Sequence, residues 1–119
     1  MNIEQLRRLC IDKKGVEESF PFDESTLVFK IGNKMFALMG LDDVDAPSVN
    51  LKGDPEYNMI LREEYQGIKP GFHMNKKHWN TVELESDVPD KMIGEMIETS
   101  YQLVYKGLTK KIKVEIDNL

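Results

Sequence analysis

The chain has 119 residues, of which 40% are hydrophobic and 31% are charged, and its formal net charge is −5. This composition suits one globular domain with a single core and excludes a disordered chain; a membrane-spanning protein is also excluded, because no run reaches the ~18 apolar residues of a span. The acidic balance argues against a surface that binds nucleic acid without specificity, which depends on cations.

The chain opens with an amphipathic pattern. Apolar residues at helical spacing predict a helix over residues 3–13, which ends near Gly15 because glycine tolerates the left-handed conformation of a helix stop. Residues 20–24 contain a proline and are predicted to form an extended link. We expect the two phenylalanines of this link, Phe20 and Phe22, to fill the edge of the core.

Three strands are predicted in the first half of the chain, from runs of β-branched, aromatic and alternating residues. They cover residues 26–31, 35–39 and 48–52. The dipeptide Gly32-Asn33 between the first two predicts a tight hairpin. Residues 42–45 carry three acidic side chains without the ligand spacing of a calcium loop, so we expect a solvated loop there.

A helix and two strands come next. Asp54-Pro55 is typical of a helix start, with a capping carboxylate followed by proline in the first turn. This helix should end by Gly67, and the residues expected on its apolar face are Tyr57, Ile60, Leu61 and Tyr65. After a Pro-Gly break, the predicted strands cover residues 72–74 and 77–84.

A long helix dominates the last third of the chain. It is predicted to open at Pro89-Asp90 and to carry an apolar stripe as far as Leu108. Residues 110–114 alternate, and either a terminal strand or a frayed tail fits them. The element order over one domain is therefore α-β-β-β-α-β-β-α. Short connections between the early strands predict an α+β, two-layer architecture, in which helices cover one face of an antiparallel sheet.

Residues with catalytic or metal-binding potential are few and scattered. Cys10 is the only cysteine and lies in an apolar periodic stretch, so we interpret it as a core residue in a reducing compartment. His73 and His78 lack the further ligands of a zinc site, and no nucleophile or phosphate-binding motif is present. We expect no enzyme activity, no metal and no cofactor. Since the chain starts without a signal-peptide pattern, we expect a cytoplasmic monomer without membrane contact.

The segment of residues 69–81 stands out because it mixes cations, aromatic rings and amides. Such side chains contact phosphates, stack on bases and read base edges. The amides of Asn75 and Asn80 could pair with adenine edges. The seven candidate nucleic-acid-binding residues are Lys69, His73, Asn75, Lys76, Lys77, His78 and Trp79. The same composition also fits a solvated turn beside a buried tryptophan, so a structural role for the segment stays open.

Lysines are distributed unevenly along the chain. Residues 65–82 and 99–114 together contain seven lysines and no acidic residue. If these two segments lie together in the fold, they form one basic surface on an otherwise acidic body.

A family resemblance centres on the same segment. Residues 71–82, GFHMNKKHWNTV, resemble the signature of the MmcQ/YjbR-like proteins. Further stretches that resemble this family cover residues 20–24, 28–38, 51–55 and 100–104. Two departures are modest: Phe72 stands where the family usually has tyrosine, and Asn33 where it often has glycine.

The resemblance implies an antiparallel α/β two-layer domain of the kind described as CyaY-like or double-wing. It also implies a DNA-binding role, which rests on analogy of fold, and it implies no catalytic residue. Three functions therefore stay open. The first is a nucleic-acid-binding module that uses residues 69–81. The second is a protein-interaction or chaperone-like adaptor, and the third is a small-ligand binder or an enzyme of unassigned activity.

Overall fold

A six-stranded antiparallel sheet, with the strand order β1-β2-β3-β4-β6-β5, organises the computed structural model, which describes residues 1–119. The strands are β1 (Val16–Ser19), β2 (Thr26–Ile31), β3 (Lys34–Gly40), β4 (Ser48–Lys52), β5 (Ile68–Pro70) and β6 (Trp79–Glu83). The helices are α1 (Ile3–Ile11), α2 (Pro55–Glu64), α3 (Asp90–Lys106) and α4 (Lys110–Asp117).

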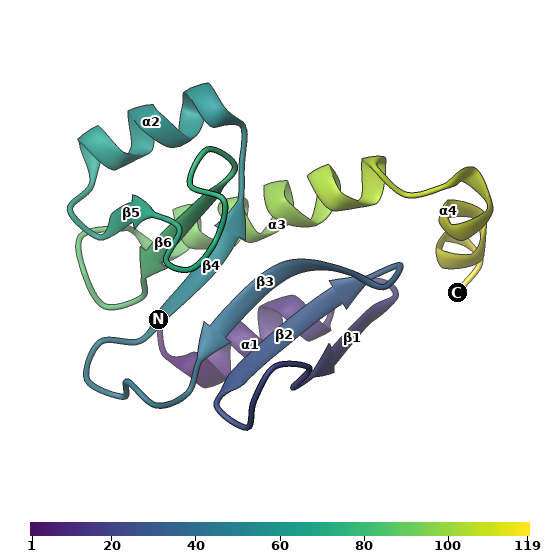
Figure 1. Ribbon diagram of the computed structural model, residues 1–119, viewed down its shortest axis with the longest axis horizontal. Coiled ribbons are helices and arrows are strands. Elements are labelled where there is room, and N and C mark those ends of the chain that lie inside the picture. Colours follow the sequence, from purple (N-terminus) through teal and green to yellow (C-terminus); the bar gives the residue numbers. More distant parts are fainter.

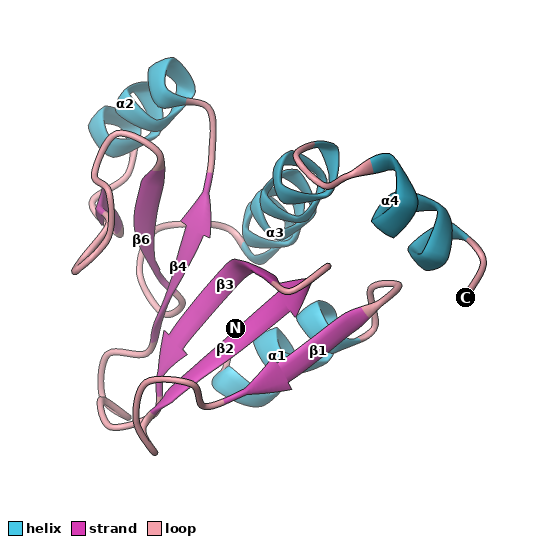
Figure 2. Ribbon diagram, turned by 45° about the vertical axis from the view of Figure 1, so that its right-hand side comes forward, coloured by secondary structure: helices cyan, strands magenta, loops and turns pink.

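The helices gather on one side of the sheet. Helices α1 and α3 lie behind it in Figure 1, and Leu61 of α2 joins the same core as these two helices. Helix α4 lies at the other end of the molecule from α2 (Figure 1 and Figure 2). The second face of the sheet, here named the open face, has no helix over it. No helix in the chain is both long enough and apolar enough to cross a lipid bilayer.

The main core fills the space between the sheet and α1 and α3. Alternation along β2 turns Leu27, Phe29 and Ile31 to this side, and all three are buried. Helix α3 presents a buried stripe to them: Ile93, Ile97, Ser100, Tyr101 and Val104. The Ser100 hydroxyl donates to the Phe36 carbonyl at 2.5 Å and accepts from the Lys52 N–H at 2.9 Å. These two bonds fix α3 on β3 and β4.

A second, smaller cluster lies on the open face. It consists of the buried residues Val28, Leu38 and Trp79, with Met35 and Met74 packed against it. Met74 belongs to the connection between β5 and β6, residues 71–78, here named the β5–β6 loop. This loop therefore covers part of the open face.

The predicted fold class is confirmed, and so is the hairpin at Gly32-Asn33, where both residues have positive φ (55° and 67°). The structure adds two elements to the predicted order. Strand β1 escapes the sequence pattern because an edge strand of half-buried and exposed residues shows no apolar alternation. Residues 110–114 form neither a strand nor a frayed tail but begin α4, where the Thr109 hydroxyl accepts a bond from the Ile112 N–H at 3.3 Å.

The strand predicted over residues 72–74 is wrong. Those residues form a turn, and the edge strand is β5, which ends in a proline. An edge position suits proline because its missing N–H would face solvent.

Two packing predictions are also wrong. Phe20 and Phe22 do not fill the core edge but are exposed. On α2, Tyr57 and Ile60 are exposed as well, because the polar residue Asn58 takes the position that faces the sheet.

Helix α4 packs on the β2–β3 turn. A Cβ added at Gly32 would lie 2.7 Å from Leu108 Cδ1 and 3.0 Å from Ile112 Cγ2. The Tyr105 hydroxyl donates to the Asp117 carboxylate at 2.8 Å, which ties α4 back to α3. The absence of a side chain at Gly32 thus serves two needs, the positive φ of the turn and the close approach of α4.

We expect Gly32→Ala to lower the free energy of unfolding by about 2 kcal/mol, because backbone strain and the clash with Leu108 add together. Denaturant titration followed by circular dichroism measures the change. The matched control is Gly94→Ala in α3, where no atom lies within 4 Å of an added Cβ. That variant should gain about 0.5–1 kcal/mol from higher helix propensity. Equal losses in both variants would contradict this account of the turn.

Candidate nucleic-acid interface

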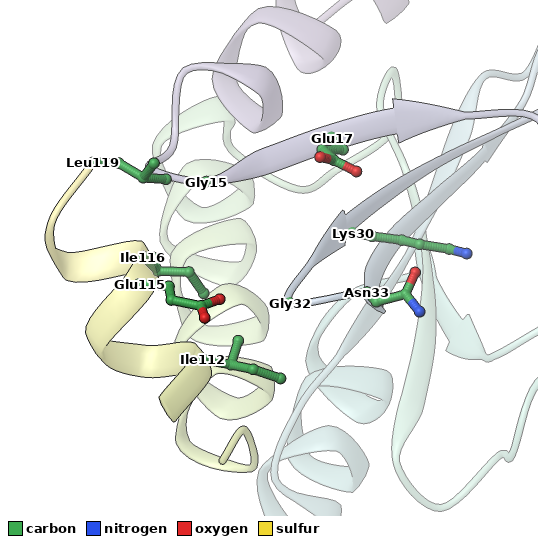
Figure 3. Close-up of a pocket in the computed structure, with 9 residues that line it drawn as sticks. All are labelled: Gly15, Glu17, Lys30, Gly32, Asn33, Ile112, Glu115, Ile116 and Leu119. Atoms are coloured by element: carbon green, nitrogen blue, oxygen red, sulfur yellow. The ribbon is translucent and has the colours of Figure 1, made fainter. Parts of the chain in front are cut away.

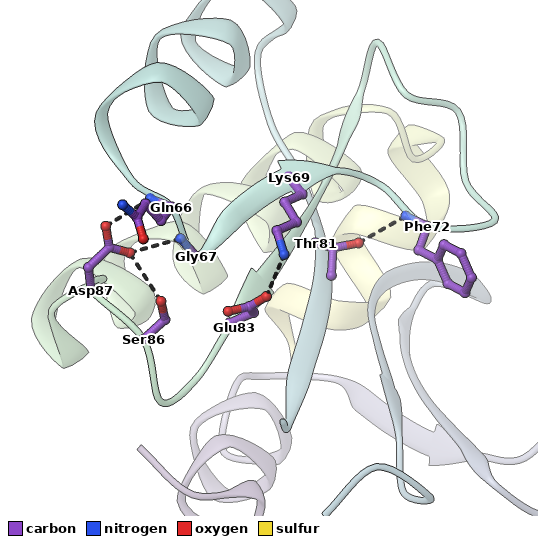
Figure 4. A network of polar contacts seen from close by, with 8 residues as sticks. All are labelled: Gln66, Gly67, Lys69, Phe72, Thr81, Glu83, Ser86 and Asp87. Carbon is purple, nitrogen blue, oxygen red and sulfur yellow. Dashed lines mark hydrogen bonds and ion pairs between the residues drawn. The ribbon is translucent and has the colours of Figure 1, made fainter. Parts of the chain in front are cut away.

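The β5–β6 loop is held against the open face by backbone bonds to two strands. The Gly71 N–H donates to the Trp79 carbonyl at 2.8 Å. The Phe72 N–H donates to Thr81 Oγ1 at 2.9 Å, as Figure 4 shows, and the Phe72 carbonyl accepts from Asn50 Nδ2 at 3.2 Å. The loop is therefore anchored through both backbone polar groups of the exposed residue Phe72.

Two residues of the loop adopt positions that few side chains tolerate. A Cβ at Gly71 would lie 2.8 Å from Trp79 Cβ, so only glycine fits so close to the tryptophan. His73 has φ +61°, in the left-handed region that non-glycine residues rarely adopt. Backbone strain of this kind persists only where surrounding contacts hold it, and it is concentrated at functional sites.

Asn75 and Lys76 support the loop from within. Asn75 Oδ1 accepts the Lys77 N–H at 3.0 Å and the His78 N–H at 3.4 Å, which is an Asx-type turn. The Lys76 ammonium donates to the Gly71 carbonyl at 2.8 Å. The side-chain oxygen of Asn75 and the charge of Lys76 are thus engaged in shaping the loop.

A buried polar network joins α2 to the strand that follows the loop. Arg62 Nε donates to Asn80 Oδ1 at 2.6 Å, and Asn80 Nδ2 donates to Asn58 Oδ1 at 3.1 Å. Arg62 also donates to the Trp79 carbonyl at 3.1 Å and to the Lys76 carbonyl. The guanidinium meets only neutral acceptors, so it acts as a multiple donor and not as half of an ion pair.

Asn58 extends this network to the loop and to Gly53, the residue that follows β4. Its Nδ2 donates to the Gly53 carbonyl at 3.2 Å and to the Lys77 carbonyl at 3.3 Å. No buried side-chain nitrogen or oxygen in the chain lacks a hydrogen-bond partner. We therefore assign Arg62, Asn58 and Asn80 to positioning the loop.

The interpretation of Asn80 as a reader of base edges is wrong, because this residue is only 1% exposed and its amide is bonded within the network. Trp79 is 9% exposed and packs in the open-face cluster, so its ring supports the loop from below. The expected packing role of Trp79 is confirmed. The exposed ring of the segment belongs instead to Phe72, which is 67% exposed and lies 4.1 Å from the His73 ring between centroids.

The open face itself carries cations that the sequence reading missed. Lys52 is the register partner of Trp79, and Lys30 follows Val28 by two residues on β2, so both project from this face. Neither forms an ion pair. The sequence does contain a signal for these two lysines. Residues alternate between the two faces of a strand, and each lysine alternates with the core residues of β2 or β4, which places it on the opposite face.

The predicted cations of the segment differ in exposure and in whether they form an ion pair. Lys69 pairs with Glu83 on the open face, with 2.9 Å between Lys69 Nζ and Glu83 Oε1 (Figure 4). The Lys77 side chain is exposed and has no ion pair, whereas His78 is half-buried. The structure thus brings all seven candidate residues into one loop and its flanking strands, and the exposed ones are Lys69, His73, Asn75, Lys76 and Lys77.

The two lysine-rich segments do not form one surface. The lysines of α4 lie at one end of the molecule, and β5, β6 and their loop lie at the other (Figure 1 and Figure 2). Helix α3 runs between these two ends. The expected basic patch is therefore limited to the open face and the β5–β6 loop.

Other groups offer little chemistry. Burial raises the pKa of the Cys10 thiol to about 12, which suits a core residue. No three side chains of His, Cys, Asp or Glu lie close enough together to hold a metal ion. A groove of about 440 Å³ separates α4 from β1 and the β2–β3 turn, and its lining includes Glu17, Lys30 and Glu115 (Figure 3). It contains neither histidine.

A carboxylate cap fixes the start of β5. Asp87 accepts the N–H groups of Gly67 and Gln66, each at 2.8 Å (Figure 4). These two bonds hold the pKa of Asp87 below its usual value of 3.8, and the bond from Gly67 has the larger effect.

A model of the YjbR family matches residues 11–103, which include all seven candidate residues. The chain belongs to the YjbR family. The protein YbdF of Escherichia coli O157:H7 is 38% identical over 108 residues, which cover 91% of this chain and 88% of YbdF. YjbR of Escherichia coli strain K12 is 34% identical over 102 residues, which cover 86% of each chain. The names of these relatives assign no activity.

Solved structures of two further proteins are similar to this YjbR-family chain. The Deinococcus radiodurans protein DR2400 is 42% identical and superposes with a TM-score of 0.90 over 98% of this chain and 88% of its own. A crystal structure of a Pseudomonas syringae protein is 31% identical, with a TM-score of 0.76 over 87% of this chain and 99% of its own.

We expect Asn58→Ala to lower the free energy of unfolding by about 1–3 kcal/mol, because it leaves the buried amide of Asn80 and the partly buried carbonyl of Lys77 without this partner. Amide hydrogen exchange should accelerate in residues 71–79. The control is Met59→Ala, an exposed neighbour on the same helix, with an expected change within about 0.5 kcal/mol. If loop exchange stays at its wild-type rate in Asn58→Ala, the network does not position the loop.

Asp87 should make stability depend on pH. Its folded pKa is depressed, so its stabilising contribution is present above the unfolded pKa and is lost as pH falls through the folded value. We expect Asp87→Asn to be less stable than the wild type at neutral pH and to lose less on acidification below about pH 4. Thermal unfolding across pH measures this, with the exposed loop residue Asp42, changed to Asn, as control. Parallel profiles for wild type and Asp87→Asn would contradict it.

Proposed function

We propose that this YjbR-family chain binds nucleic acid through the open face and the β5–β6 loop. The observation that carries the proposal is the anchoring of this loop on the open face, where it presents Phe72, His73 and Lys77 to solvent beside Lys52. Phosphate contacts supply most of the affinity of such surfaces, and aromatic rings add base stacking.

The acidic net charge of −5 does not conflict with this proposal, because the relevant quantity is the local field. Lys52 and Lys77 have no ion-pair partner, whereas Lys69 is offset by Glu83 and Lys30 lies opposite Glu17, its register partner on β1. A site with so few free cations should bind with modest affinity and strong dependence on salt.

We further propose a binding role and not a catalytic one. The protonated, buried thiol of Cys10 and the use of Asn75, Lys76 and Asn80 in structural bonds support this view. The cytoplasmic location, the monomeric state and the lack of a cofactor stay predictions.

A protein partner is the second candidate, and one observation favours it. Tyr57, Met59 and Ile60 are all exposed on α2, away from the side that carries Asn58. Exposed apolar side chains that gather on one helix are typical of protein-interaction sites. This surface is distinct from the open face, so the two candidates are separable by mutation.

We expect DNA binding to weaken steeply as the salt concentration rises. The double variant Lys52→Gln/Lys77→Gln should reduce the slope of log K against log salt by about 1–2, because each lost phosphate contact contributes about 0.7–0.9 to that slope. Fluorescence anisotropy with labelled duplex and single-stranded DNA, at about 50 and 200 mM salt, measures both slopes.

The matched control is Lys110→Gln/Lys111→Gln, which removes the same charge from α4 at the other end of the molecule. Its slope should equal that of the wild type. Equal effects of the two double variants would mean that net charge, and not the open face, governs binding. No binding to either form of DNA at low salt would overturn the proposal.

A further inference from the structure

We infer that the ligand of the open face is a single-stranded nucleic acid, and that one of its bases stacks on the Phe72–His73 ring pair. This inference rests on the proposed function and names its substrate class. It depends on three features of the β5–β6 loop: an exposed aromatic pair, a backbone that holds the pair in place, and nearby groups that can follow a sugar–phosphate chain.

The aromatic pair is exposed in a way that needs an explanation. Phe72 is 67% exposed, and Figure 4 shows its ring turned away from Thr81, which holds the Phe72 N–H. The His73 ring lies 4.1 Å from it between centroids and is tilted by 50°. No bond or ion pair engages the His73 side chain. The two rings therefore offer π surface to solvent, which is the surface that base stacking uses.

The backbone under this pair is fixed, which reduces the entropy lost on binding. Both the N–H and the carbonyl of Phe72 are bonded to side chains of the sheet, Thr81 and Asn50. Thr81 Oγ1 in turn donates to Asn50 Oδ1 at 2.5 Å. His73 keeps its left-handed φ of +61° because the residues on either side of it are anchored.

Cations flank the pair on both sides along the open face. Lys69 is the register partner of Thr81, the residue that holds the Phe72 N–H. Lys52 lies two residues from Asn50 on the same strand and the same face, about 7 Å away. A strand that stacks a base on Phe72 can therefore place a neighbouring phosphate near the Lys52 ammonium, whereas the Lys69 ammonium is already paired with Glu83.

A single strand suits this surface better than a duplex. In a duplex both faces of each base are covered by neighbouring bases, so an exposed ring gains nothing unless it separates a base step. Reading the major groove requires an α-helix or a β-ribbon that projects from the protein. The open face offers neither, because its loop lies down on the sheet. Unstacked bases, in contrast, leave a π face free for Phe72.

The test is anisotropy titration of the full chain with labelled single-stranded DNA of about 20 nucleotides and with the duplex of the same sequence. We expect the single strand to bind at least about tenfold more tightly than the duplex. Phe72→Ala should weaken single-strand binding by about 5- to 150-fold, the range for one base–aromatic stack, and leave the salt slope unchanged. Phe72→Tyr should retain the wild-type affinity.

The matched control is Phe22→Ala, which removes another exposed phenylalanine, in the connection between β1 and β2, and should leave binding unchanged. Equal or tighter binding of the duplex, with no effect of Phe72→Ala, would overturn this inference and leave the proposed function intact. Failure to bind either form of DNA would overturn both. A loss of single-strand binding in Phe72→Ala and Phe22→Ala alike would also count against a stacking site at Phe72.

Discussion

The buried hydrogen bonds of Arg62, Asn58 and Asn80 are the constraint on which the candidate site depends. They lie beside the apolar contact of Leu61 at the place where α2 meets the sheet, and their donors also reach the carbonyls of Lys76 and Lys77 in the β5–β6 loop. Since a buried polar group without a partner is costly, the loop cannot leave its position without exposing or orphaning several groups at once. Helix, strand and loop are thereby coupled into one cooperative unit.

The sheet divides structural and binding roles between its two faces. The helix side holds the main core, and the bonds of Ser100 lock α3 to β3 and β4. The open face has only the small cluster around Trp79, so the β5–β6 loop can lie on it and still present polar and aromatic groups to solvent. A fixed backbone that presents polar and aromatic side chains to solvent can bind an extended ligand without rearranging.

Local patterns predicted much of the fold, and non-local contacts account for most of the errors. The turn at Gly32-Asn33 and the stripe of α3 follow from spacing alone. Strand β1 and the exposure of Phe22 depend on what lies at the sheet edge, which spacing does not reveal. The composition of residues 69–81 singled out this segment, and its binding role stays a prediction. The burial of Asn80 depends on a bond with Asn58, 22 residues away. No local pattern distinguishes such an amide from one that faces solvent.

The placement of Trp79 gives the molecule an optical property of its own. It is the only tryptophan in the chain, and it lies outside the main core, in the cluster that Met74 covers from the β5–β6 loop. Indole emission responds to the polarity of its immediate surroundings, and here those surroundings are one face of the sheet. Emission from Trp79, excited at a wavelength that the four tyrosines do not absorb, therefore reports on the open face alone, whereas circular dichroism reports on the helices of the rest of the fold.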